Sequence, residues 1–141
     1  MEGLKTAQSN FGPQETMDRL EREILAHGMR VFRRINHASM AAEAGLELLP
    51  TELIMFGNSR VGTSLMQASQ TIGIDLPLKA LVWQDAAGKT WLAYNDPAWL
   101  TKRHQISEAE RTVAAMTRVL GEIAVKATGD RTQRVGNEVK A

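Results

Sequence analysis

The chain has 141 residues, of which 43% are hydrophobic and 23% are charged, a composition typical of one folded domain with its own core. Its 17 basic and 16 acidic residues leave a net charge of +1, which gives no electrostatic reason to expect nucleic acid as a partner. Cysteine is absent, which excludes disulfides, thiolate catalysis and cysteine-ligated metal centres.

The N-terminal sequence lacks the basic start and following apolar run of a secretory signal. No apolar run approaches the roughly 20 residues that a membrane-spanning helix needs. We therefore expect a soluble cytoplasmic protein without a membrane partner.

The first part of the chain is predicted to alternate strands and helices. Residues 4–10 form a weak first strand, and residues 13–27 show the three- and four-residue spacing of apolar side chains that is typical of an amphipathic helix. Residues 29–35 follow as a strand, in which the alternation of side chains places Val31 and Ile35 on the same face.

The middle of the chain contains the best candidate for a binding site. Asn36 is predicted to cap a short helix that ends before Gly45, and residues 51–56 form a buried strand. Residues 57–63 then form a polar loop bounded by glycines, and a helix begins at Ser64. A buried strand that leads into such a loop is a common way to build a site.

The last part of the chain is predicted to form a β-hairpin and a long helix. Residues 79–84 and 90–94 are the strands of the hairpin, and Gly88 suits the left-handed position in the loop between them. The helix begins with a capping box at Ser107 and ends at Gly129, and one apolar stripe follows its length.

These elements predict an α+β fold with an at least partly antiparallel sheet and two long amphipathic helices packed on one face. Residues 1–129 would form this single domain, and residues 130–141 are polar and aperiodic, which predicts a disordered tail. Aromatic side chains such as Trp83 and Trp91 would reach the other face of the sheet, where they could support self-association.

Several short strings occur in a fixed order along the middle of the chain: Asn36–Ala38, Ala44–Leu46, Pro50–Leu53, Phe56–Asn58, Gly62–Met66, Ile74–Lys79 and Tyr94–Asp96. In this order they resemble the domain-of-unknown-function 302 family. Two positions depart from the family pattern, because Asn36 replaces an expected acidic residue and Ser59 replaces an expected proline.

The resemblance implies a small domain whose curved, mainly antiparallel sheet is backed by two helices. This arrangement is similar to the fold of the TATA-binding protein and is commonly paired as a homodimer. The resemblance implies no established activity. It implies no DNA binding either, since function depends on a site and not on a fold.

The loop at residues 57–63 has the glycines of a nucleotide-binding loop but lacks its lysine. Thr63 stands where that lysine would contact phosphate, which argues against an ATPase or GTPase. Backbone N–H groups at the start of a helix can still hold an anion. Alternatively, the glycines only permit a turn and Thr63 or Ser64 caps the helix. The predicted ligand-binding residues are Gly57, Asn58, Gly62, Thr63, Lys79, Tyr94 and Asn95.

An enzyme is the first alternative to a binding domain. His37 would act as an acid or base with Glu52 or Asp75, provided that the fold brings these side chains together. His27 is interpreted as a surface residue and His104 as a surface or structural one. None of the 3 histidines has the spacing of a metal site, so we expect no metal and no cofactor.

The sequence thus favours a homodimeric module that binds or senses a small anionic or polar ligand, and it disfavours an enzyme. A purely structural dimerisation module is the second alternative, because the open face of the predicted sheet is sufficient for self-association.

Overall fold

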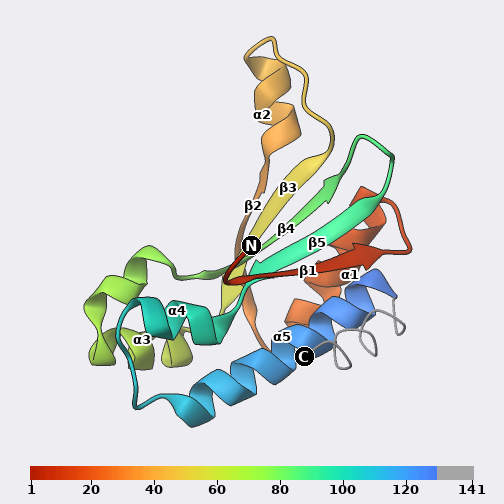
Figure 1. Cartoon of the computed structure of the whole chain (residues 1–141). Coiled ribbons are helices and arrows are strands. Elements are labelled where there is room, and N and C mark those ends of the chain that lie inside the picture. The colour runs from red at the N-terminus through yellow and green to blue at the C-terminus, as the bar shows by residue number, and fades with distance from the viewer. Residues whose placement is uncertain (130–141) are drawn as a thin grey trace.

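A computed structural model describes residues 1–129, so the predicted tail at residues 130–141 lies outside the described part of the chain. Figure 1 shows the arrangement of the elements. In chain order they are β1 Leu4–Ser9, α1 Pro13–Ala26, β2 Arg30–Asn36, α2 His37–Glu43, β3 Thr51–Gly57, α3 Ser59–Ala68, the 3-10 helix η1 Gln70–Ile74, β4 Leu78–Gln84, β5 Thr90–Asn95, α4 Pro97–Arg103 and α5 Glu110–Thr128.

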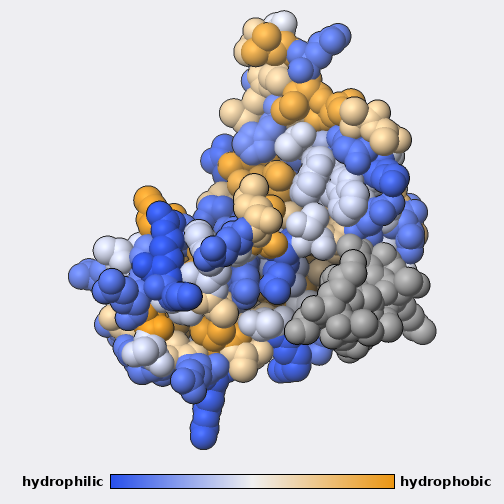
Figure 2. All heavy atoms as spheres, viewed as in Figure 1, coloured by the Kyte–Doolittle hydropathy of each residue, from blue (hydrophilic) through white to orange (hydrophobic). Residues whose placement is uncertain are grey.

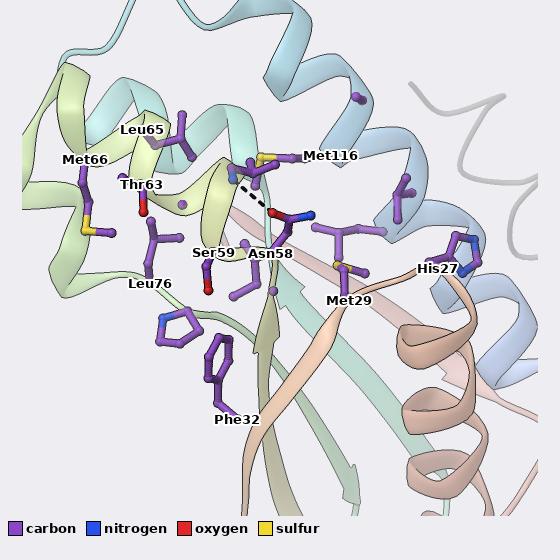
Figure 3. Close-up of a pocket in the computed structure, with 18 of the residues that line it drawn as sticks. His27, Met29, Phe32, Asn58, Ser59, Thr63, Leu65, Met66, Leu76 and Met116 are labelled. Carbon is purple, nitrogen blue, oxygen red and sulfur yellow. Dashed lines mark hydrogen bonds between the residues drawn. The ribbon is translucent and has the colours of Figure 1, made fainter.

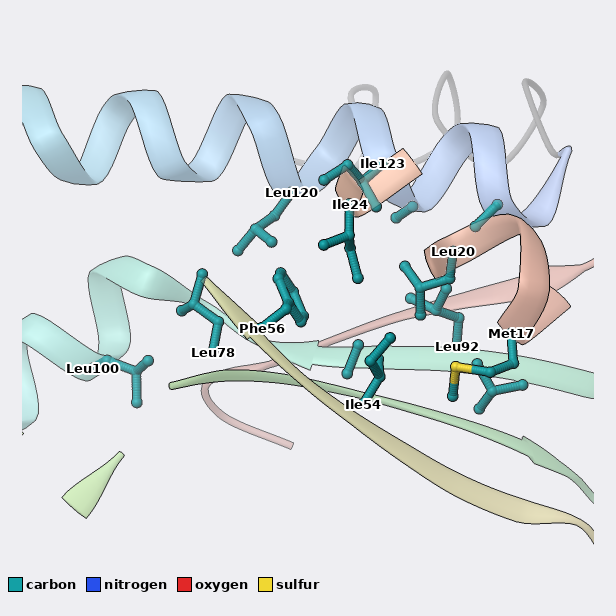
Figure 4. Packing of buried hydrophobic residues seen from close by; sticks show 14 of the residues in the cluster. Met17, Leu20, Ile24, Ile54, Phe56, Leu78, Leu92, Leu100, Leu120 and Ile123 are labelled. Atoms are coloured by element: carbon teal, nitrogen blue, oxygen red, sulfur yellow. The ribbon is translucent and has the colours of Figure 1, made fainter. Parts of the chain in front are cut away.

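The strands form one five-stranded sheet in the order β1-β5-β4-β3-β2, and every neighbouring pair is antiparallel. The two longest helices, α1 and α5, pack on the same face of the sheet, and Figure 4 shows the core side chains between these helices and the strands. The predicted α+β fold with helices on one face is therefore confirmed.

The core follows from the alternation of side chains along the central strands. Ile54 and Phe56 of β3 are buried and pair with Ala80 and Leu78 of β4, so both strands direct these residues toward the helices. The helices contribute buried side chains at helical spacing: Met17, Leu20 and Ile24 from α1, and Leu120, Ile123, Ala124 and Ala127 from α5.

A bulge in β2 changes the predicted faces of this strand. Val31 pairs with Phe56, but the next residue in register is Arg33, which leaves Phe32 as an extra residue. Val31 consequently faces the helices, whereas Arg33 and Ile35 face the other side. The prediction that Val31 and Ile35 share a face is wrong, because the extra residue shifts the alternation by one position.

The beginning of α5 also differs from the prediction. The N-cap of α5 is Ala109, which makes no side-chain hydrogen bond to the helix. The hydroxyl of Ser107 instead donates to the carboxylate of Glu108 at 3.3 Å. The predicted capping box at Ser107 is therefore wrong, while the predicted end of the helix at Gly129 is confirmed by its left-handed backbone, with φ of 70°.

An arm formed by β2, α2 and β3 projects beyond the rest of the sheet (Figure 1). Asn36 caps α2 as predicted, since its side-chain oxygen accepts a hydrogen bond from the Ser39 N–H at 3.0 Å. At the base of the arm, Arg34 of β2 donates to Glu52 of β3 at 2.9 Å and to Glu21 of α1 at 3.0 Å. These bonds fasten the arm to the body of the domain.

Within residues 1–129, no helix is both long enough and apolar enough to cross a membrane.

We expect Phe56→Ala to lower the free energy of unfolding by about 3–5 kcal/mol, because it removes a fully buried aromatic side chain and leaves a cavity. Phe56 is 1% exposed in the core. Urea unfolding followed by circular dichroism measures the loss. The control is Leu25→Ala, which truncates a side chain that is 53% exposed on α1. Equal losses in the two variants would contradict this description of the core.

Candidate functional site

A cavity of about 380 Å³ lies where β3 leads into α3 (Figure 3). Its lining comes from the connection between α1 and β2, from β2, α3, η1 and α5, and from the adjacent ends of β3 and β4 with the residues just before β4. Its size is within the range of small-molecule sites. Most of the lining side chains are apolar: Met29, Phe32, Val61, Leu65, Met66, Leu76, Pro77, Leu78, Met116, Val119 and Leu120. Polar groups come from His27, Asn58, Ser59 and Thr63.

Asn58 sets the geometry at the centre of this site. Its side-chain oxygen accepts hydrogen bonds from the N–H groups of Arg60 and Val61 at 2.9 and 3.2 Å, so α3 begins at Ser59. The predicted loop at residues 57–63 is therefore wrong beyond Asn58, because the remaining residues form the first turns of the helix. Asn58, an asparagine directly after a buried strand, was the signal for this helix start.

The glycines and Thr63 have roles different from those predicted. Gly62 lies inside α3, where an added Cβ would meet Leu76 Cδ1 at 3.7 Å, an ordinary contact distance. Thr63 also lies inside the helix and caps nothing at its start. Nevertheless, Gly57, Asn58, Gly62 and Thr63 all line the cavity. The structure thus brings together four of the seven predicted ligand-binding residues.

The other three predicted residues, Lys79, Tyr94 and Asn95, lie elsewhere on the sheet and are not among the described residues that line the cavity. Tyr94 pairs with Ala80, which faces the helices, whereas the preceding Lys79 faces the opposite side. Asn95 pairs with Leu4 of β1. Burial raises the pKa of Tyr94, in keeping with its position against the core.

Lys79 supports the turn that leads into β4. Its Nζ donates to the backbone carbonyls of Asp75 and Pro77 at 3.2 and 2.9 Å. Burial lowers the pKa of Lys79, although the nearby charge of Asp75 opposes this shift. The ammonium group is therefore bound to backbone oxygens and does not face the cavity.

The predicted acid–base set of His37, Glu52 and Asp75 is not assembled among the described residues. Both carboxylate oxygens of Glu52 accept hydrogen bonds from Arg34 at 2.9 Å, and these bonds hold the pKa of Arg34 above its usual range. Asp75 is bound instead by Arg103, whose Nη1 donates to both of its oxygens at 2.9 Å. Glu52 and Asp75, the two carboxylates that were predicted to work with His37, thus have other partners.

A hydrogen-bonded cluster that sequence reasoning missed joins η1 to the end of α4. His104 Nδ1 lies 2.8 Å from the hydroxyl oxygen of Thr71, and its Nε2 is bonded to the Asp75 carboxylate. Because a carboxylate only accepts, Nε2 carries a hydrogen, and Nδ1 of the neutral ring accepts from Thr71. Asp75 and Thr71 lie 29 and 33 positions before His104 in the sequence, so no local pattern could indicate the cluster.

His27 is not the free surface residue that was predicted. Its side chain is 19% exposed, with Nδ1 2.8 Å from the Glu23 carbonyl oxygen and Nε2 3.4 Å from Glu122. The hydrogen bond with His27, together with Arg118, lowers the pKa of Glu122. His27 thereby links α1 to α5 at the edge of the cavity. Residues 1–129 contain no group of three or more side chains suited to hold a metal ion.

The model of the family described as domain of unknown function DUF302 matches residues 5–123. The chain belongs to this family. The family match confirms the resemblance seen in the short strings of the sequence. It extends that resemblance to the flanking helices α1 and most of α5, because the matched range includes them.

Curated relatives of this DUF302 domain include two longer proteins named fluoride-specific ion channel FluC 1. The protein from Brucella suis biovar 1 is 46% identical over 129 residues, which cover 91% of this chain and 51% of the relative. The protein from Brucella abortus biovar 1 is also 46% identical over 129 residues, which cover 48% of its length. The chain therefore spans about half the length of the relatives it matches.

Among solved structures, the domain resembles an uncharacterised conserved DUF302 protein from Bacillus stearothermophilus. The TM-score is 0.81, and the match covers 90% of this chain and 99% of the other, at 20% sequence identity. This similarity shows that the two chains share the fold.

Proposed function

We propose that this DUF302 domain is a cytoplasmic, homodimeric module that binds a small ligand in the cavity beside α3. The observation that carries the proposal is the cavity of about 380 Å³, whose mostly apolar lining contains a few polar groups. Small-molecule sites commonly combine an apolar lining with a few polar groups that fix the orientation of the ligand.

The lining refines the chemistry of the ligand that the sequence predicted. Ser59 and Thr63 supply hydroxyl groups along α3, whereas Met66 and Met116 supply flexible apolar side chains around it (Figure 3). A ligand with an apolar body and one polar group fits this lining better than a bare anion does. Asn58 uses its side-chain oxygen to cap α3, so it can offer the ligand only the N–H donors of its amide, beside the hydroxyl groups of Ser59 and Thr63.

We expect the uncharged fluorophore N-phenyl-1-naphthylamine to bind saturably in the cavity and to gain fluorescence. Ala115→Trp should weaken this binding by about tenfold or more, equivalent to about 1.4 kcal/mol, because Ala115 is an exposed residue of α5 that lines the cavity. The control is Ala114→Trp, which adds the same side chain at an exposed neighbouring position outside the lining.

Fluorescence titration measures the affinity of the wild-type protein and of both variants for the probe, with excitation at a wavelength that the probe absorbs. Absence of saturable binding to the wild-type protein, or equal weakening by the two tryptophans, would contradict the cavity as the ligand site.

The proposed dimer uses the face of the sheet opposite α1 and α5. Leu53 pairs with Leu81 and Trp83 pairs with Trp91 on this face, and all four side chains are only half-buried in the single chain. Adjacent apolar side chains of this kind are typical of self-association surfaces.

We expect light scattering to give a mass of twice 15.6 kDa for the wild-type protein. Leu81→Asp should shift the protein to monomer, because it places a charge at the centre of the contact. Leu25→Asp introduces the same charge on the exposed side of α1 and should leave the dimer intact, with circular dichroism verifying the fold of both variants. A wild-type monomer at all concentrations would overturn the dimer.

A second candidate function is that of an accessory domain of a fluoride channel. The supporting observation is that the chain matches about half of two Brucella proteins named as fluoride-specific ion channels. Residues 1–129 contain no helix that could span a membrane, so we assign the channel to the other half of such a protein.

To test this candidate, the matching half of the Brucella suis protein would be exchanged for residues 1–129 of this chain. We expect the chimera to retain fluoride efflux from proteoliposomes and a version without the matching half to lose or alter it. The control chimera carries Phe56→Ala, which damages the core of the domain. Identical efflux in the parent, the shortened protein and both chimeras would exclude an accessory role.

A further inference from the structure

The segment between α3 and β4 forms one wall of the cavity. Gly73, Leu76 and Pro77 of this segment line the cavity, and a Cβ at Gly73 would lie only 3.2 Å from Met66 Sδ, which also belongs to the lining. The position of the segment therefore determines the shape of the site.

Apolar packing holds this wall through few side chains. In η1 only Ile72 is buried, and the neighbouring Ile74 is 76% exposed. A wall with so little buried apolar surface needs other contacts to keep one position.

Polar contacts on the outer side of the wall supply this restraint. His104 binds both Thr71 and Asp75, and Arg103 also binds Asp75. Two residues at the end of α4 therefore hold the segment near both ends of η1. The side chains of His104 and Asp75 are 7% and 15% exposed. A charged hydrogen bond that is shielded from water contributes more than an exposed ion pair does.

We propose that His104 and Asp75 are positioning residues of the ligand cavity, which they shape by holding its η1 wall against α4. This inference rests on the proposed ligand-binding function. Protonation of His104 preserves the cluster, because the ring then donates to Asp75 and to the Thr71 hydroxyl, which can also accept. Protonation of Asp75 weakens it, because the bonds from His104 and Arg103 lose their charged acceptor.

The charged groups around His104 contribute to the cluster in different ways. Asp75 is the charged acceptor, Arg103 is a cation that binds it, and His104 donates to it from Nε2. Lys79 approaches from β4, but its Nζ binds the backbone carbonyl of Asp75 and not its carboxylate. The affinity of the cavity for its ligand should consequently fall when Asp75 is replaced by a side chain without a charge.

The test compares His104→Leu with His104→Gln, whose amide can still donate to Asp75 from a position close to that of Nε2. We expect His104→Leu to speed hydrogen exchange of the amides in residues 70–77 and to weaken binding of N-phenyl-1-naphthylamine at least threefold. His104→Gln should restore most of both properties. The matched control, His37→Leu, makes the same substitution on α2, away from the cavity, and should change neither.

Removal of the negative charge of Asp75 provides a second readout. Asp75→Asn should bind the probe more weakly than the wild-type protein, because the bonds from His104 and Arg103 lose their charged acceptor. Wild-type affinity in Asp75→Asn would contradict the positioning role of Asp75.

The hydrogen-exchange measurement requires no ligand, so it tests the positioning role of His104 independently of the proposed ligand binding. If the wild-type protein does not bind the probe, the ligand-binding function fails, and the exchange of residues 70–77 alone decides whether His104 holds the wall. Wild-type exchange rates in His104→Leu, or faster exchange without a loss of affinity, would overturn the positioning role.

Discussion

The hydrogen bonds from the N–H groups of Arg60 and Val61 to the Asn58 side chain are the interaction on which the site depends. They allow a buried strand to pass into a helix within one residue, without an intervening loop. Phe56 thereby stays in the core while the residues just after it line the cavity. The core and the site are consequently adjacent in one packed unit, so a substitution that shifts side chains in one should also shift them in the other.

The elements that the sequence predicted well are those with local signals. The hairpin around Gly88 follows from turn chemistry and alternation, and the apolar stripe ending at Gly129 follows from helical spacing. The short helix after Asn36 was also recognisable, because an asparagine cap acts on amides only a few residues away. Such features depend on neighbours in the chain, and the antiparallel α+β fold follows from them together with the family resemblance.

The features that the sequence did not predict depend on contacts between distant segments. The bulge at Phe32 appears only when β2 is aligned with β3, and the pairing of Asp75 with His104 requires α4 to fold back onto η1. Lys79 and Tyr94 were both assigned to the predicted site, but their side chains leave opposite faces of the sheet. Gly57, Asn58, Gly62 and Thr63 of the predicted site nevertheless line one cavity, because they lie at the end of β3 or in the first turns of the helix that follows it.

The bulge at Phe32 has a consequence for how copies of this domain can meet. β2 is an edge strand, and a regular edge offers its unpaired backbone groups to any other strand, which can lead to open-ended fibres. The extra residue interrupts that pattern, and Arg30 and Arg33 place exposed charges along the same strand. This edge therefore resists the addition of further strands, so assemblies of this domain through the β2 edge would not grow without limit.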